Sequence, residues 1–158
     1  MHIHRICLLV SFLFLFQWLP FQVHAFSPAS SAGQLEEEII ELINQYRQKK
    51  NLSPLAANNT LSRLARKHSK DMAAGRRPFG HDGAEQRFRT AGKEINKLSA
   101  FWENVAFGYS SAEGVVEGWI NSPGHRKNME SKATIVGVGV ASDKNGRLYF
   151  TALFVRAG

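Results

Sequence analysis

The fold is signalled most clearly by one stretch of the chain, WINSPGHRKN at 119–128. Its first half is apolar and helix-like, and the Pro-Gly pair in its middle predicts that the helix ends there. His125 follows directly and is therefore expected at an exposed chain turn. Two shorter stretches precede it, FGHDG at 79–83 and ENVA at 103–106. Together the three segments contribute two histidines and a carboxylate, which folding could bring to one polar site.

The composition indicates one ordinary globular domain. The chain has 158 residues, of which 44% are hydrophobic and 21% are charged, and this is typical of a protein with a single core. The sequence contains no fixed-period repeat, no glycine-rich phosphate loop and no Cys/His zinc-finger spacing. Solenoid proteins, nucleotide-binding P-loop proteins and zinc fingers are therefore excluded.

The first residues predict export. A basic start, a nearly unbroken apolar run at 6–19 and the small-residue ending at Ala25 are typical of a secretory signal peptide over residues 1–25. An uncleaved membrane anchor is the alternative, because about 20 apolar residues can span a bilayer. Cys7, the only cysteine, lies inside this run, so the mature domain must be held by packing without a disulfide. We expect a secreted protein, with the periplasm or cell wall as other destinations.

The chain is basic, with a net charge of +7. Removal of residues 1–25 takes away only Arg5 and leaves +6. Such a charge could favour anionic cell-wall polymers, lipid headgroups or nucleic acid. The Lys and Arg residues are interspersed with acidic ones in the sequence, however, so solubility is the simpler explanation. We predict a monomer with no nucleic-acid partner.

Helical periodicity divides the first part of the chain. Residues 26–34 are expected to form a disordered leader, and the domain is expected to occupy 35–158. Apolar residues recur at helical spacing from Leu35 to Tyr46 and again from Leu61 to Met72. His68 lies on the second apolar stripe and is expected to be a hydrogen-bonded core residue. The predicted helices are 35–51, 59–75, one or two turns within 84–91, and a helix that follows a capping box at Ser110-x-x-Glu113 and ends before Pro123.

Strand signals dominate the end of the chain. The stretch 101–109 is expected to be extended, and 135–141 and 148–155 form a predicted hairpin around Asn145-Gly146. In the first hairpin strand three valines share one face, whereas Gly137 and Gly139 leave the other face bare. This pattern predicts that another element approaches that face closely.

In order along the chain, these motifs resemble the CAP superfamily of cysteine-rich secretory, antigen five and pathogenesis-related proteins, specifically the SCP-like domain of its short, cysteine-poor bacterial branch. The similarity covers residues 35–156 and includes LxxLAxxHSxDM at 61–72, HD at 81–82 and YFT at 149–151, together with the stretches quoted above. The resemblance implies an α+β fold: a three-layer α/β/α sandwich with a central antiparallel sheet. It also implies a cleft with a tetrad of two histidines and two acidic residues.

The resemblance assigns three members of the tetrad. His81 and His125 take the histidine positions and Glu103 takes the first glutamate position. Ser122 stands where animal and plant members have the second glutamate, so the fourth member is absent. Ser122, Glu117 or a water molecule could take its place, although Glu117 is expected to point away because it lies two residues from Trp119 on a helix.

The resemblance implies no shared reaction, because family members are mostly signalling, defence or lipid-binding proteins. Our first hypothesis is therefore a secreted, non-enzymatic binding module. Its ligand cleft contains His81, Glu103, His125 and Ser122 and takes a lipid, a peptide or a cell-wall fragment. His81 and His125, with Glu103 as third ligand, could hold a divalent metal such as zinc.

Two other hypotheses remain open. In the second, the domain is a metal-assisted, peptidase-like hydrolase in which Glu103 is the general base. In the third, Glu103 and His125 hydrogen-bond each other and only hold the segments together. A serine nucleophile at Ser122 is disfavoured, because a serine before Pro-Gly is more simply a helix cap.

Overall fold

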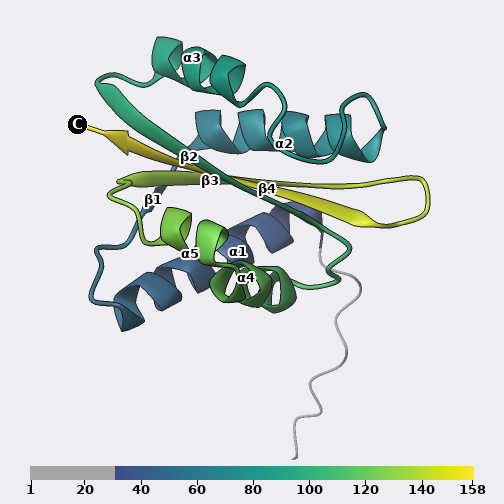
Figure 1. The fold of residues 1–158 in the computed structure, drawn as a ribbon, viewed down its shortest axis with the longest axis horizontal. Coiled ribbons are helices and arrows are strands. Elements are labelled where there is room, and N and C mark those ends of the chain that lie inside the picture. Colours follow the sequence, from purple (N-terminus) through teal and green to yellow (C-terminus); the bar gives the residue numbers. More distant parts are fainter. Residues whose placement is uncertain (1–30) are drawn as a thin grey trace, which may run out of the picture.

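The computed structural model describes residues 31–158, which form three layers (Figure 1). A sheet lies in the middle, with α2 and α3 on one side and α1, α4 and α5 on the other. This arrangement confirms the predicted α/β/α sandwich. The predicted signal peptide over 1–25 and the first part of the leader lie outside the described residues.

Helix α1 begins earlier than the apolar periodicity indicated. It spans Ala32–Lys49 and is preceded by a capping box, in which the Gln34 backbone N–H donates to Ser31 Oγ at 3.3 Å and the Ser31 N–H donates to Gln34 Oε1 at 2.8 Å. Reciprocal bonds of this kind satisfy backbone donors that a helix start leaves open. The prediction of a disordered leader was therefore wrong for its last residues, which are helical.

Three further helices match the predicted ones, with changed boundaries. Helix α2 spans Asn59–Ala73, α3 spans Ala84–Glu94 and α4 spans Ala112–Asn121. The predicted capping box at Ser110 was wrong by one residue. Ser111 is the cap, since its Oγ accepts from the Gly114 N–H at 3.1 Å.

Helix α5, Pro123–Met129, was not predicted. Pro123 was taken only as the end of α4, but proline is also favoured at the first position of a helix, where its missing N–H costs nothing. His125 therefore lies within a short helix and not in a turn. Arg47 of α1 holds this helix, because its Nη1 donates to the carbonyl oxygens of Met129 at 2.7 Å and Ser131 at 3.0 Å.

The sheet has the strand order β1-β3-β4-β2. Its strands are β1 Ala56–Ala57, β2 Leu98–Phe107, β3 Ile135–Ser142 and β4 Leu148–Ala157. β4 pairs antiparallel with β3 and with β2, and the β3–β4 pairing confirms the predicted hairpin. The short β1 pairs parallel with β3. The sheet is therefore mixed, whereas the resemblance implied an antiparallel one.

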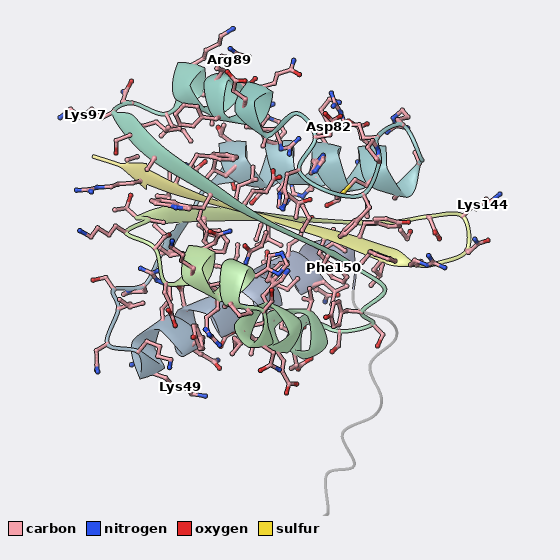
Figure 2. The ribbon with its side chains drawn as sticks, viewed as in Figure 1. Lys49, Asp82, Arg89, Lys97, Lys144 and Phe150 are labelled. Atoms are coloured by element: carbon pink, nitrogen blue, oxygen red, sulfur yellow. The ribbon has the colours of Figure 1, made fainter. Side chains whose placement is uncertain are left out.

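The two faces of the sheet pack differently. A large apolar cluster, which includes Trp119 and Phe150, fills the space between the sheet and α1, α4 and α5, whereas a smaller one lies under α2 and α3. Figure 2 shows Phe150 on the side of α4. On the other face α2 lies directly on β3, since a Cβ at Gly137 or Gly139 would overlap the backbone of α2. The close approach predicted at these glycines is confirmed.

Candidate functional site

Glu103 is the centre of a buried ion pair. This residue of β2 is only 6% exposed. Arg87 of α3 donates to both of its carboxylate oxygens, from Nε to Oε2 at 2.6 Å and from Nη2 to Oε1 at 2.8 Å. His81 Nδ1 lies 2.9 Å from Oε1 and must donate there, because an ionised carboxylate only accepts. Both oxygens of Glu103 are therefore engaged.

Arg87 was missed by the sequence analysis. It is 8% exposed, and its Nη1 also donates to the Asp82 carbonyl oxygen at 2.9 Å. One guanidinium thus joins α3, the loop before it and β2. Its bidentate pairing with Glu103 is the strongest form of such a bond. No local signal marks it, since it lies among other basic residues on a polar helix.

The loop that carries His81 is held from below by His68. His68 is 2% exposed, and its Nε2 donates to the Gly80 carbonyl oxygen at 2.8 Å. Burial, and secondly the charge of Arg87, lower its pKa, so the imidazole is neutral at pH 7. The prediction of a hydrogen-bonded core histidine is confirmed. His81 itself has a side chain that is 53% exposed, with its Nε2 directed away from the carboxylate bond.

His125 is joined to Glu103 only indirectly. Asn104 donates from Nδ2 to the His125 carbonyl oxygen at 3.0 Å. Asn128 donates to Asn104 Oδ1 at 2.9 Å and to the Glu103 carbonyl oxygen at 3.0 Å. These bonds fix α5 against β2, and Asn104 satisfies a backbone carbonyl of α5. The direct bond between Glu103 and His125 that the third hypothesis offered is absent among residues 31–158, because Arg87 and His81 bind the carboxylate.

The side chain of His125 lines a hollow of about 260 Å³ at the surface. Burial lowers its pKa, and the nearby His81 lowers it further, so the ring is neutral at pH 7. Ser122 lines the same hollow, whereas His81 and Glu103, which were also expected in the ligand cleft, do not. Glu117 is exposed on α4 and does not line it either. We call this hollow the aromatic cleft; its lining is Phe79, Val105, Ala106, Phe107, Tyr109, Gly118, Trp119, Ser122 and His125.

The rim of the aromatic cleft exposes large apolar side chains. Phe79 is 49% exposed, Phe107 is 43% exposed and Tyr109 is 38% exposed. The rings of Phe79 and Phe107 meet edge to face at a centroid distance of 4.7 Å, and Tyr149 stacks on Phe107 at 5.7 Å. Contiguous exposed apolar groups of this kind mark interaction sites.

The residues do not fit the predicted three-ligand metal site. Glu103 is 6% exposed and both of its oxygens accept hydrogen bonds, whereas the imidazoles of His81 and His125 are the more accessible donors. Zinc in catalytic sites takes three protein ligands and a water. Within residues 31–158, no group of three or more His, Cys, Asp or Glu side chains is arranged to hold a metal ion.

The comparison with protein families decides the identity of this domain. Residues 40–154 match the model of the family described as CAP, Cysteine-rich secretory protein family. The chain belongs to the CAP family. The resemblance seen in the sequence motifs is thereby confirmed.

Two curated relatives come from Bacillus subtilis (strain 168). The CAP domain is 37% identical to YkwD over 121 residues, which cover 72% of this chain and 45% of YkwD. It is 32% identical to the membrane protein YlbC over 127 residues, which cover 77% of this chain and 34% of YlbC. The chain thus spans less than half the length of either relative.

Solved structures agree with the fold. An extracellular SCP-domain protein from Bacillus anthracis is 30% identical, with a TM-score of 0.67 and coverage of 82% of this chain and 45% of that one. An outer surface protein from Borrelia burgdorferi shares the fold at 22% identity, with a TM-score of 0.66 and coverage of 77% of this chain and 92% of that one. Among residues 31–158, no helix has the length and apolarity needed to cross a bilayer.

Proposed function

We propose that this CAP domain is a secreted, monomeric, non-enzymatic binding module whose aromatic cleft takes an amphipathic ligand. The observation that carries the proposal is the pairing of both Glu103 oxygens with Arg87 and His81 beside a cleft walled by exposed aromatic rings. The first part engages the carboxylate that the hydrolase hypothesis uses as its general base. The second part supplies a surface that binds apolar groups.

The ion pair argues against the hydrolase hypothesis. A general base must accept a proton at the reacting atoms. Glu103 is 6% exposed, and both of its oxygens already accept hydrogen bonds, from Arg87 and from His81. Glu103 therefore serves to orient His81, whose Nδ1 donates to Oε1 at 2.9 Å.

The cleft suits a ligand with an apolar body and a polar end. Phe79, Phe107 and Tyr109 offer the apolar wall, while His125 and Ser122 offer polar atoms. The indole Nε1 of Trp119, which also lines the cleft, has no hydrogen-bond partner within the described part of the chain. An unpaired buried N–H costs about 1–3 kcal/mol. Fatty acids, short apolar peptides and acylated wall fragments all have this amphipathic form.

The test uses the dye 1-anilinonaphthalene-8-sulfonate, which has an apolar ring system and an anionic group. We expect its fluorescence to rise with the protein and to be displaced by dodecanoate. The Phe79→Ser/Phe107→Ser variant should weaken dye binding about tenfold, because two apolar contacts are lost. The matched control Phe88→Ser/Phe101→Ser removes two ring partners that lie outside the cleft. Equal dye binding by the cleft variant and the native protein would refute the cleft as a ligand site.

Calorimetry with zinc separates this proposal from the hydrolase hypothesis. We expect no micromolar binding that depends on Glu103, since its oxygens are engaged. The Glu103→Gln variant should therefore bind zinc as the native protein does. Tight zinc binding that Glu103→Gln abolishes, together with peptide hydrolysis, would support the metal-assisted hydrolase instead.

A further inference from the structure

The positive charge of this protein lies mainly on one of its layers. Residues 59–97, which include α2 and α3, contain ten Lys and Arg residues and four Asp and Glu residues. The other residues within 31–158 contain nine of each. Arg66 and Arg87 pair with carboxylates of other elements, Glu36 and Glu103. Four positive charges therefore remain uncompensated on the α2–α3 layer, against two elsewhere.

Helix periodicity collects these charges into a stripe. Arg63, Arg66, Lys67 and Lys70 are all exposed on α2 and stand at positions i, i+3, i+4 and i+7. Residues at this spacing share one face of a helix, and the stripe runs about 10 Å along the axis. Leu61, Leu64 and Ala65 form the opposite, buried face. Charges that are dispersed in the sequence are therefore adjacent on the surface.

Three hollows follow the basic stripe. The first, of about 290 Å³, lies between α2 and α3; the second, of about 630 Å³, shares Arg63, Lys67 and Asp71 with it, and Asp71 is paired with Lys67 and Arg76. The third, of about 770 Å³, shares Lys70 and Arg76 with the second and reaches Lys144 in the β3–β4 loop. Figure 2 shows Lys144 at the end of this hairpin. The hollows thus form one continuous basic groove along α2.

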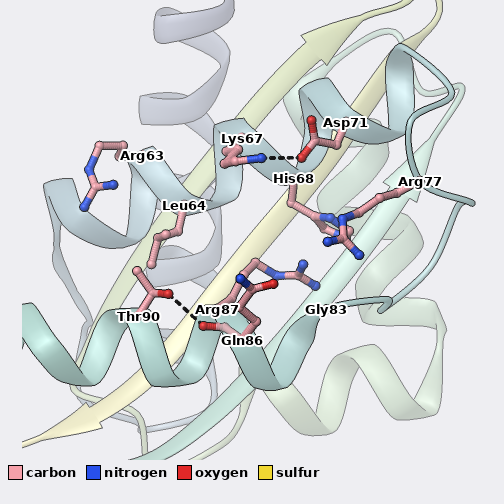
Figure 3. Close-up of a pocket in the computed structure, with 10 residues that line it drawn as sticks. All are labelled: Arg63, Leu64, Lys67, His68, Asp71, Arg77, Gly83, Gln86, Arg87 and Thr90. Atoms are coloured by element: carbon pink, nitrogen blue, oxygen red, sulfur yellow. Dashed lines mark hydrogen bonds and ion pairs between the residues drawn. The ribbon is translucent and has the colours of Figure 1, made fainter.

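The inner end of the groove holds two guanidinium groups. Figure 3 shows Arg63 and Lys67 on α2, with Arg77 and Arg87 beside His68. A Cβ built on Gly83 would lie 3.1 Å from Arg77 Nη1 and 3.4 Å from Arg87 Nη1, so these cations are close neighbours. Arg77 also pairs with the exposed Asp82. Arg87 is engaged by Glu103, so Arg77, whose partner Asp82 is exposed, is the guanidinium at this end that is open to a phosphate.

We propose that the basic groove binds a linear polyanion without aromatic groups, such as a polyol-phosphate chain. A connected row of hollows suits a flexible chain better than a flat bilayer. The residues that line the three hollows include no Phe, Tyr or Trp. Single-stranded nucleic acid is bound largely by stacking on such side chains, so a backbone of phosphates alone is the better match. This proposal is independent of the aromatic cleft.

The experiment measures binding of end-labelled poly(glycerol phosphate) by fluorescence anisotropy across about 50 to 200 mM NaCl. The test variant is Arg63→Gln/Lys67→Gln/Lys70→Gln. The control Lys49→Gln/Lys127→Gln/Lys132→Gln removes the same charge from exposed positions of the opposite side. We expect the test variant to lose at least about tenfold in affinity and about 2 units of salt slope, since each released phosphate contact accounts for roughly 0.7. The control should stay within about twofold of the native protein.

A single substitution tests the groove in case the triple variant does not fold. Lys70 makes no ion pair within residues 31–158, so Lys70→Glu should leave the circular dichroism unchanged while it weakens the polymer complex. Phe79→Ser/Phe107→Ser should leave polymer affinity unchanged, which separates this groove from the aromatic cleft. Equal loss in both triple variants would overturn the proposal. Tighter binding to oligothymidylate of matched charge, or to phosphatidylglycerol vesicles, would also overturn it.

Discussion

The two sides of strand β3 show two ways to attach helices to a sheet. Toward α1, α4 and α5 the strand presents Val136, Val138 and Val140, which join the large apolar cluster. Toward α2 it presents Gly137 and Gly139, and the helix backbone rests directly on the strand. The first side is therefore stabilised by packed apolar side chains. On the α2 side there is no room for a side chain at positions 137 and 139.

The α2 side compensates with buried polar bonds. Ser69 of α2 donates to the Gly139 carbonyl oxygen and contacts Thr151 Oγ1, both at 2.8 Å. Glu36, 3% exposed, accepts from the Val140 N–H at 3.0 Å and pairs with Arg66. Directional bonds of this kind fail when one partner is lost, while an apolar cluster loses stability in proportion to the atoms removed.

The largest expected effect tests the dependence on buried polar bonds. Arg87→Met leaves the Glu103 carboxylate buried and unpaired, and it should lower the free energy of unfolding by about 3–5 kcal/mol. Urea unfolding followed by circular dichroism measures this. The control Arg89→Met, on the exposed face of the same helix, should change stability by less than about 0.5 kcal/mol.

The double variant Arg87→Met/Glu103→Leu sharpens the same point. It removes both charges, so we expect it to recover a large part of the stability lost in Arg87→Met. If the double variant is less stable than the native protein by the sum of the losses measured for Arg87→Met and Glu103→Leu separately, the pair is not the coupled unit described here.

A smaller loss is expected from filling the bare side of β3. The new Cβ in Gly139→Ala would overlap the backbone of Arg66, so α2 must move, at an expected cost of about 3 kcal/mol. On the other side, Val138→Ala should cost about 1.5 kcal/mol through lost apolar burial. Gly92→Ala in α3, where the added atom meets nothing within 4 Å, should stabilise by about 0.5–1 kcal/mol. If Val138→Ala lowered the free energy of unfolding more than Gly139→Ala did, the proposed difference between the two faces would be wrong.

The smallest expected effect concerns pH. Burial lowers the pKa of His68 and of His125, so the unfolded chain binds more protons than the folded one below about pH 6.5. The free energy of unfolding should be constant above that pH. It should decline as the pH falls from the histidine pKa of the unfolded chain toward the lower pKa of the folded protein. Urea midpoints at about pH 7.5 and about pH 5 measure the decline.

Histidine variants assign this pH dependence. His68→Gln should flatten it more than His125→Gln, because His68 is 2% exposed whereas His125 is only partly buried. A decline of equal size in the native protein and both variants would show that other groups are responsible.

Much of the fold could be predicted because its signals are local. Apolar periodicity located α1 and α2, and the Asn145-Gly146 turn located the hairpin. Helix α5 was not predicted because a proline can end one helix and also occupy the first position of the next, and Pro123 does both. The predicted cap of α4 was one residue too early, because Ser110 and Ser111 are adjacent and each has a hydroxyl that can cap a helix.

The candidate site was predicted less completely. The motifs named His81, Glu103 and His125, and the structure places His81 on Glu103 and His125 in the aromatic cleft. They did not name Arg87, which decides the chemistry of Glu103. Its spacing along α3 resembles that of any solvent-exposed basic residue. Only the packing of α3 against β2 shows that its side chain is buried.

The sequence by itself determined the family, the order of the main elements and the bare face of β3. These features depend on residue types at short, fixed spacings. The periods of helices and strands decide directly which of those residues share a face. Tertiary structure alone decided which charges meet. Arg87 and Glu103 are 16 residues apart and on different elements, and the basic groove joins α2 to a distant hairpin. Electrostatic interactions depend on distance and burial in space, and a linear sequence specifies neither.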